Sequence, residues 1–328
     1  MSQPPYSLTS AIVDLVARIG EALGRLSAQQ ALASSLRLRR LNRIRTIQGS
    51  LAIEGNTLSE AQITAILDGK PVMAPPRDIQ EARNAIKAYE QFEQWRPVSE
   101  QDLLTAHRLL MAGLLDTPGH YRSGGVGVMN GPQVVHMAPP ANRVPLLMGN
   151  LLNWLGSTDA HPLITSSVFH YEFEFIHPFE DGNGRMGRLW QTLILSRWNP
   201  QLAHIPVESL VHAHQAEYYQ ALNESTRLGD SAPFIEFMLR MILDALQSNA
   251  PPVTPHVTPQ VEQLLTALQG EMSREELQAR LDLQDRKSFR ERYLQPALAQ
   301  GLIEYSRPDK PNSRLQKYRL TELGRALQ

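Results

Sequence analysis

The 328-residue chain contains no cysteine, and this absence removes several kinds of chemistry. Thiolate nucleophiles, disulfides and cysteine-based zinc sites are all excluded. No apolar run is long enough to span a bilayer, and the amino-terminal segment MSQPPYSLTS lacks the basic region and apolar core of a signal peptide. These absences predict a soluble, cytoplasmic protein with no membrane partner.

An excess of charge of either sign is also lacking, because 32 Lys and Arg residues face 33 Asp and Glu residues. Net charge therefore predicts neither a nucleic-acid coat nor a membrane-surface protein, and any anion site must be local. No repeat or low-complexity tract is present. The length favours about two domains.

Apolar residues at helical spacing run through most of the chain, so we expect a mainly α fold. The proline-free stretch 9–55 predicts long helices. Ser59 and Gln62 have the spacing of a capping box, and Leu58 and Ile63 that of a hydrophobic staple. Gly69 and Pro71 should end that helix. Further helices are predicted over 78–95, 99–115, 144–156, 165–175 and 184–198, with two more before 248.

Two segments depart from this helical pattern. Residues 119–140 are rich in glycine and β-branched residues around an Asn-Gly pair, which predicts a β-hairpin. Residues 249–259 are proline-rich and predict a linker. Beyond them, three short helices and a two-stranded wing with its tip at 307–314 predict a winged-helix domain. We expect a helical region at 1–98, a core at 99–248, the linker at 249–259 and the winged helix at 260–328.

The stretch HPFEDGNGRMGRLW, from His177 to Trp190, places a glycine-containing loop at the start of an amphipathic helix. Gly182, Asn183 and Gly184 suit a backbone nest, and the first-turn amides of the helix lack partners. Arg185 and Arg188 lie three apart and can face the same way. Because the helix dipole disfavours cations there, two arginines indicate a polyanion in front of them.

Two residues before the nest, Asp181 and His177, have side chains suited to phosphoryl chemistry. Asp181 can hold magnesium on phosphate oxygens, whereas its neighbour Glu180 need not face the same way. His177 precedes Pro178, which biases it towards an extended backbone, and its imidazole can accept the proton of an attacking hydroxyl. The order of these residues indicates attack on a nucleotide phosphorus.

Other interpretations of the motif explain less of it. A calcium loop would need a glutamate at the position of Thr192 and would not carry Arg185. A catalytic metal held by His170, His177 and Asp181 would leave the glycines and arginines without a role. A surface turn is common for a single glycine-rich loop but not for this ordered set.

The motif HPFEDGNGRMGR resembles the Fic-domain core motif at every defined position. FHYEFEFIHPF upstream and EYYQALNEST downstream support the resemblance, which covers about 40–246. It implies a protein adenylyltransferase, in which AMP moves from ATP to a Ser, Thr or Tyr hydroxyl of a protein, with the chain itself an open alternative target. In this family a winged-helix domain frequently follows the Fic domain. The resemblance leaves open whether the chain forms a homodimer.

The resemblance assigns roles to the motif residues. His177 is the base, Asp181 holds magnesium, and the backbone of Gly182, Asn183 and Gly184 cradles the phosphates. The arginines of the motif bind ATP phosphates, and the hairpin holds the target as an added strand. The arginines implied to bind ATP are Arg185 and Arg188. The hairpin residues implied to hold the target are Val126, Val128, Val135 and Met137, and we call this hairpin the flap.

Several details are left open by the resemblance. Tyr218 and Tyr219 resemble adenine-side residues, but two aromatics at helical spacing suit a core equally well. Doc-type kinases carry lysine where this chain has Gly184, which favours nucleotidyl transfer over phosphorylation. Phosphocholine transfer and uridylylation reuse the same motif and remain alternatives.

The stretch SLAIEGN resembles the inhibitory motif of the family and predicts an inhibitory helix at about 42–55. Ser50 and Glu54 share a helix face, and Gly55 is placed to end the helix. Glu54 near a helix carboxyl end needs a cationic partner, and the family supplies the second arginine, Arg188, in a two-pronged pair. Such a pair would keep Arg188 from the γ-phosphate. The alternatives are a solvated glutamate or one that orients water for AMP removal.

The segment from residue 273 onward holds twelve basic and eight acidic residues, a net charge of about +4. DRKSFRERY would be a recognition helix and RPDKPNSR the wing tip. A DNA-binding regulator with an accessory Fic domain is therefore the second function to consider. Protein docking is the alternative use of such a module.

Overall fold

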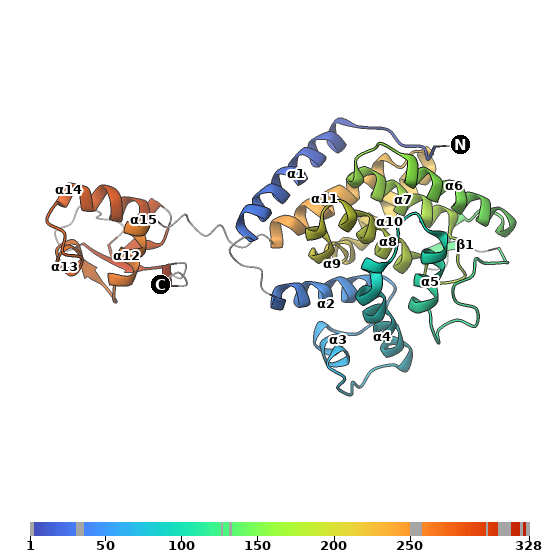
Figure 1. Cartoon of the computed structure of the whole chain (residues 1–328), viewed down its shortest axis with the longest axis horizontal. Helices are drawn as coiled ribbons and strands as arrows, with labels where there is room; N and C mark the ends of the chain where they lie inside the picture. The colour runs from blue at the N-terminus through green and yellow to red at the C-terminus, as the bar shows by residue number, and fades with distance from the viewer. Residues whose placement is uncertain are drawn as a thin grey trace. The chain divides into compact units, whose positions relative to one another are not determined.

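Helices dominate the chain, which confirms the expected fold class. The computed structural model describes residues 3–30, 36–125, 127–130, 133–249, 258–299, 301–307, 316–321 and 324–325. It contains two compact units, 1–250 and 251–328, each with its own apolar core (Figure 1). Among the described residues, no helix is both long and apolar enough to cross a membrane.

The larger unit is built from helices, short 3₁₀ segments and one hairpin. Its helices are α1 (Ser10–Gln30), α2 (Leu36–Ile53), α3 (Glu60–Leu67), α4 (Pro76–Gln91), α5 (Glu100–Leu110), α6 (Val144–Ser157), α7 (Pro162–Ile176), α8 (Asn183–Trp198), α9 (Val207–Ala213), α10 (Gln215–Leu228) and α11 (Ala232–Asn249). Its 3₁₀ segments are η1 (Phe92–Gln94), η2 (Ala141–Arg143) and η3 (Pro200–His204). The capping box of Ser59 and Gln62 is present at α3.

The two helices expected between 199 and 248 are in fact three. α9 ends at Ala213 and α10 begins at Gln215, with His214 between them at φ −111° and ψ 33°. The break carries neither glycine nor proline, so no residue type marks it in the sequence.

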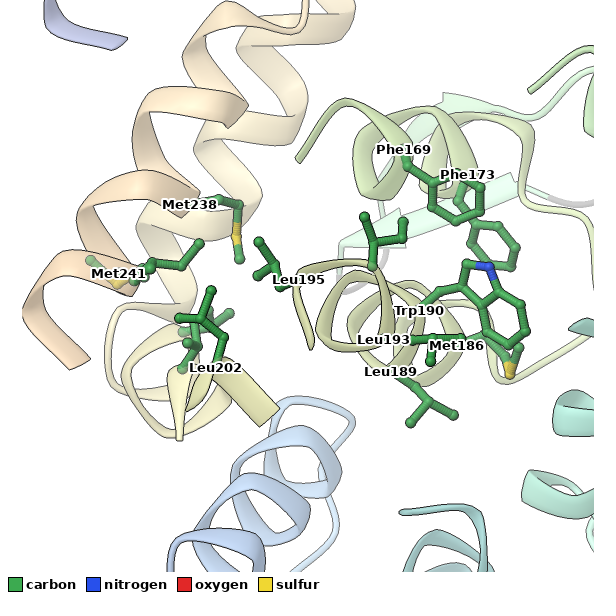
Figure 2. Close-up of a cluster of buried hydrophobic side chains, with 14 of the residues drawn as sticks. Phe169, Phe173, Met186, Leu189, Trp190, Leu193, Leu195, Leu202, Met238 and Met241 are labelled. Atoms are coloured by element: carbon green, nitrogen blue, oxygen red, sulfur yellow. The ribbon is translucent and has the colours of Figure 1, made fainter. Parts of the chain in front are cut away.

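Helix α8 lies at the centre of the larger unit, packed on α7 (Figure 2). Nearly every residue from Asn183 to Leu195 is buried. Trp190 lies near Phe169 and Phe173 of α7 and donates its indole N–H to Pro97 O at 2.9 Å. The amphipathic helix we expected is therefore a central one, because its polar side chains find partners on other helices.

Glycine sets the position of α2, the helix that carries the inhibitory motif. α2 packs on α9, and a Cβ at Gly49 would lie 2.6 Å from Glu208 C and Ser209 N. Only glycine allows this approach without a shift of one helix. Gly55, at φ 86°, ends the α2 segment as expected. α1 packs along α11 (Figure 1).

The hairpin consists of β1 (Gly127–Asn130) and β2 (Gln133–Met137), paired antiparallel with a bulge between Val128 and Met129. Val128 pairs with His136, and Gly127 pairs with Met137. Val126 lies outside the described residues, whereas Val135 lies within β2. The docking role of this flap stays a prediction.

The smaller unit follows residues 250–257, which lie outside the described residues and make up most of the expected linker. Its elements are α12 (Pro259–Ala267), β3 (Met272–Ser273), α13 (Arg274–Arg280), α14 (Arg286–Phe289), the π-helical turn η4 (Arg290–Leu294), α15 (Gln295–Ala299), β4 (Ile303–Tyr305) and β5 (Lys317–Leu320). The antiparallel sheet has the order β3-β5-β4 and so adds β3 to the two expected strands. The wing tip lies almost wholly outside the described residues, and the winged-helix assignment stays a prediction.

Candidate active site

His177 ends α7 in a left-handed conformation, with φ 49° and ψ 62°. The extended backbone that we expected before Pro178 is therefore wrong. The reason lies in Arg122, which donates to the carbonyls of His177 at 2.7 Å and Ile176 at 3.2 Å and is itself buried. The backbone N–H of Arg122 also donates to Pro178 O at 2.9 Å. Histidine tolerates this region better than most residues, so the tertiary contacts prevail.

Arg122 also binds the base of the hairpin. Its guanidinium donates to Gly124 O at 2.9 Å and to Pro139 O at 2.6 Å. Burial lowers the pKa of Arg122, but four carbonyl acceptors satisfy the cation. One buried side chain thus ties the hairpin to the backbone of His177.

The loop between His177 and α8 is held from inside by Asn183. Its Oδ1 accepts from Phe179 N at 2.9 Å, and its Nδ2 donates to Phe179 O at 3.0 Å. His107 of α5 stacks on Phe179 with ring centroids 3.6 Å apart and donates from Nε2 to Asp181 O at 3.0 Å. Burial lowers the pKa of His107 to about 4, so the ring is neutral. The Asn183 side chain therefore holds the loop, and only its backbone can face a ligand.

Gly182 is the residue before α8, at φ 84°. A Cβ there would lie 2.7 Å from Met111 Sδ, so both the angle and the space require glycine. Gly184 is already helical and, unlike Gly182, does not have a positive φ. Among the described residues, the first-turn amides at 183–185 have no acceptor. These amides point out of the helix start, as in an anion site.

Arg188 is buried and bound to α2. Its Nη2 lies 2.7 Å from Glu54 Oε1 and 2.9 Å from Ser50 O, and its Nε donates to Ser50 Oγ at 3.1 Å. Glu54 therefore binds with one prong rather than the two we expected, because Ser50 takes the second edge of the guanidinium. A Cβ at Gly184 would lie 2.2 Å from Glu54 Oε1, so the carboxylate lies directly over the start of α8.

Arg185 faces a different set of partners. It lies in a ring of alternating charge with two residues of α4: Arg185 Nη1 is 3.2 Å from Glu81 Oε1, and Arg77 Nη2 is 3.1 Å from Asp181 Oδ2. Arg185 Nη2 is 3.1 Å from Asp181 Oδ1, and Arg77 Nε is 3.4 Å from Glu81 Oε1. Asn56 donates to Glu81 Oε2 at 2.9 Å and so joins this ring to the end of the inhibitory segment.

Asp181 offers one carboxylate to a metal. Its side chain is 40% exposed, and within the described residues no cluster of three or more His, Asp or Glu side chains could hold a metal ion. Magnesium usually keeps few protein ligands and takes others from phosphates. The residues present therefore fit a magnesium ion that arrives with a nucleotide, and they do not fit a metal centre made of protein ligands alone.

His170 cannot share a metal with His177 and Asp181. Its Nδ1 lies 2.7 Å from Gln191 Oε1 and its Nε2 lies 3.1 Å from Tyr218 OH, which uses both ring nitrogens. Burial lowers the pKa of His170 to about 3. Tyr218 is 2% exposed and packs among Phe234 and Phe237, so it is a core residue rather than an adenine contact. Tyr219 is half-buried, and burial raises its pKa.

The ring of His177 is oriented by Glu174. His177 Nδ1 lies 3.3 Å from Glu174 O, which can only accept, so Nδ1 carries the proton and the lone pair lies on Nε2. Nε2 is the atom that can act as a base. Glu174, Glu81, Arg77 and Arg122 were all missed in the sequence, because no motif marks a partner that comes from another element.

Comparison with known proteins agrees with this geometry. The family model described as Fic/DOC family matches residues 97–195, and the model described as the C-terminal domain of Fic-like proteins matches residues 259–321. A crystal structure of a Fic family protein from Desulfovibrio desulfuricans is 54% identical, with a TM-score of 0.75 over 98% of this chain and 99% of that one. The chain belongs to the Fic family.

Curated relatives are more distant. A protein adenylyltransferase Fic from Nematostella vectensis is 31% identical over 59% of this chain and 45% of its own length. A protein of the same name from Aedes aegypti is 30% identical over 60% of this chain and 39% of its own length. The chain thus spans less than half the length of these relatives.

Proposed function

We propose that the chain is a protein adenylyltransferase that transfers AMP from ATP to a Ser, Thr or Tyr hydroxyl of a target protein or of itself. The observation that carries the proposal is the start of α8, where open amides and two buried guanidiniums lie together. Arg185 Nε is buried without a hydrogen-bond acceptor in the described part of the chain, and Nη1 faces Glu81 Oε1 at 3.2 Å as an ion pair without a hydrogen bond. Unsatisfied donors on a buried cation are unfavourable, and an anionic ligand would satisfy them.

In the proposed reaction His177 Nε2 takes the proton of the acceptor hydroxyl. The hydroxyl oxygen forms a bond to the α-phosphorus of ATP, and the bond from that phosphorus to the pyrophosphate breaks. A magnesium ion held by Asp181 and phosphate oxygens would supply charge neutralisation. Positioning and charge neutralisation account for most of the catalysis in such displacements.

The choice of nucleotide rests on two supports. Relatives at about 30% identity carry the name protein adenylyltransferase. A side chain at position 184 would collide with Glu54 and Arg188, so the lysine of the kinase branch is not compatible with this resting site. AMP transfer is therefore proposed ahead of phosphorylation.

We also propose that Glu54 inhibits the enzyme. Three hydrogen bonds hold Arg188 on α2, and its guanidinium must leave Glu54 before it can bind a phosphate. A coupling free energy of about 1–3 kcal/mol corresponds to roughly 5 to 150-fold repression.

The test compares Glu54→Gly with the parent chain and with Glu54→Gly/His177→Ala. Each is incubated with magnesium and labelled ATP or UTP, and modified peptides are identified by mass spectrometry. We expect ATP label on hydroxyl side chains of Glu54→Gly, label on the parent that forms roughly 5 to 150-fold more slowly, and none on the double variant. Absence of ATP label, preference for UTP, or full labelling without His177 would refute the proposal.

A further inference from the structure

Glu174 carries a buried carboxyl beside the site. The proposed reaction assigns no role to this carboxyl. Its side chain is 12% exposed, with Oε2 3.8 Å from His177 Nδ1 and Oε1 3.9 Å from His170 Nε2. In the described part of the chain Oε1 has no hydrogen-bond donor. A Cβ at Gly187 would lie 3.1 Å from Oε1, so glycine on α8 leaves the space that the carboxyl fills.

Packing alone does not explain a glutamate at this position. A buried oxygen without a donor costs free energy that an apolar side chain of similar size would not. The carboxyl is close to charged and titratable groups on four helices. These groups are Glu54 directly after α2, His170 and His177 at α7, Arg188 of α8, and Tyr218 and Tyr219 of α10.

These surroundings decide the charge of Glu174. Burial raises its pKa to about 8, Arg188 lowers the pKa, and the Glu54 carboxylate raises it. In the resting chain Glu174 is therefore mostly neutral at pH 7. A polyphosphate that replaces Glu54 on Arg188 restores the like charge, so ionisation of Glu174 is favoured instead by the positive charge that forms on the His177 ring, whose Nδ1 lies 3.8 Å from Oε2.

We propose that Glu174 is a positioning residue for His177. The carboxylate of Glu174 holds the imidazole ring with Nε2 towards the acceptor and stabilises the imidazolium formed during transfer. This inference rests on the proposed function, in which His177 is the base. The proton stays on His177, and Glu174 acts only through its charge and its contact with the Nδ1 edge. Displacement of Glu54 frees Arg188, and the imidazolium of His177 then favours the charged form of Glu174.

The chain offers a matched control in Glu172. It lies on the same helix, two residues earlier, so it does not share a face with Glu174. Burial raises the pKa of Glu172 to about 7, without a contribution from Arg188 or Glu54. Glu172→Gln therefore removes a similar buried acid without touching His177.

The experiment measures AMP transfer by Glu54→Gly, Glu54→Gly/Glu174→Gln and Glu54→Gly/Glu172→Gln from about pH 6 to pH 9. For the Glu174 variant we expect kcat to fall about tenfold, well short of the hundredfold or more that a general base contributes, with KM for ATP unchanged. The part of the pH dependence of kcat that comes from ionisation of Glu174 should be lost in that variant, whereas the Glu172 control should keep the pH profile of Glu54→Gly. Melting at about pH 5 should be the same in all three, because both acids are mostly neutral there in the folded chain and glutamine resembles the neutral acid.

The possible outcomes distinguish a failure of the proposed AMP transfer from a failure of the proposed role of Glu174. If Glu54→Gly transfers no AMP, the proposed function fails. If Glu54→Gly is active and Glu174→Gln keeps both its kcat and its pH profile, only the role of Glu174 is overturned. A change in KM alone, or the same loss in the Glu172 control, would mean that Glu174 acts through packing and would equally overturn it.

Discussion

Arg188 connects sequence, fold and proposed regulation within one side chain. Burial alone would lower its pKa, but the Glu54 carboxylate beside it raises the pKa overall, so the guanidinium stays charged in the core. A buried cation needs a partner, and Glu54 supplies it in the resting chain. A polyphosphate would be an equivalent partner, and competition between the two anions is the physical basis of the proposed brake.

Glu174 should also make the fold sensitive to alkaline pH. Its pKa is raised in the folded state, so the folded chain binds more protons than the unfolded one between about pH 4.5 and pH 8. The free energy of unfolding should therefore fall as pH rises through this window. In Glu174→Gln this fall should be smaller, and the variant should melt at a higher temperature than the parent at about pH 9. For a unit of this size, a change of about 1 kcal/mol in the free energy of unfolding shifts the melting temperature by roughly 2–4 °C.

Calorimetric melting of both chains between about pH 5 and pH 9 checks this prediction. Equal slopes of melting temperature against pH would show that Glu174 does not hold its proton in the folded state.

For single residues, a side chain's partner can be predicted from the sequence when both residues belong to motifs, and cannot when the partner comes from a distant element. The pairing of Glu54 with Arg188 could be anticipated, because both belong to motifs with known spacing. Arg77, Glu81 and Arg122 could not, because their partners lie far along the chain. His177 was assigned the wrong backbone because the preference before proline is weaker than the hydrogen bonds that Arg122 makes.

Among the secondary-structure elements, the close contact of α2 with α9 sets the position of Ser50 and Glu54, the residues of the proposed brake. In Gly49→Ala the new Cβ would meet the α9 backbone at 2.6 Å, so α2 must shift and carry Ser50 and Glu54 with it. We expect self-modification by the otherwise unaltered chain to rise several-fold, within the 5 to 150-fold range of the brake, and the melting temperature to fall.

Gly20→Ala is the matched control, because a Cβ at Gly20 of α1 would meet nothing within 4 Å. Alanine in an open helical position stabilises by up to about 1 kcal/mol relative to glycine. This variant should melt slightly higher and label no faster than the parent. If Gly49→Ala labels no faster than Gly20→Ala, the packing of α2 does not control the site.

Element boundaries followed from the sequence where a capping residue was present. Ser59 and Ser99 cap α3 and α5, and Gly55 follows α2 as expected. The break between α9 and α10 and the two-residue strand β3 carry no such signal. The burial of α8 on almost all sides also could not be seen, because it depends on helices that surround α8 only in the folded chain.

At the scale of the whole molecule, the two units have separate cores. The core of 1–250 and the core of 251–328 share no residue. All residues of the proposed site belong to the first unit. A chain ending at residue 250 should therefore fold and, with Glu54→Gly, transfer AMP to itself at a rate within about threefold of the full-length variant, since separate cores contribute nearly independently.

The comparison of initial rates and melting curves for the two chain lengths tests this independence. A truncated chain that melts at the same temperature but loses transfer would show that the second unit contributes to the site. The mainly helical fold could be foreseen from periodicity.

We propose that ATP phosphates and Glu54 compete for Arg188 at the start of α8. The initial rate of AMP transfer from magnesium ATP by the parent, Glu54→Gly and Glu54→Gly/Arg188→Ala tests this competition. Glu54→Gly should be roughly 5 to 150-fold faster than the parent, and the double variant should lose this gain. Equal rates for parent and Glu54→Gly, or a double variant as fast as Glu54→Gly, would contradict it.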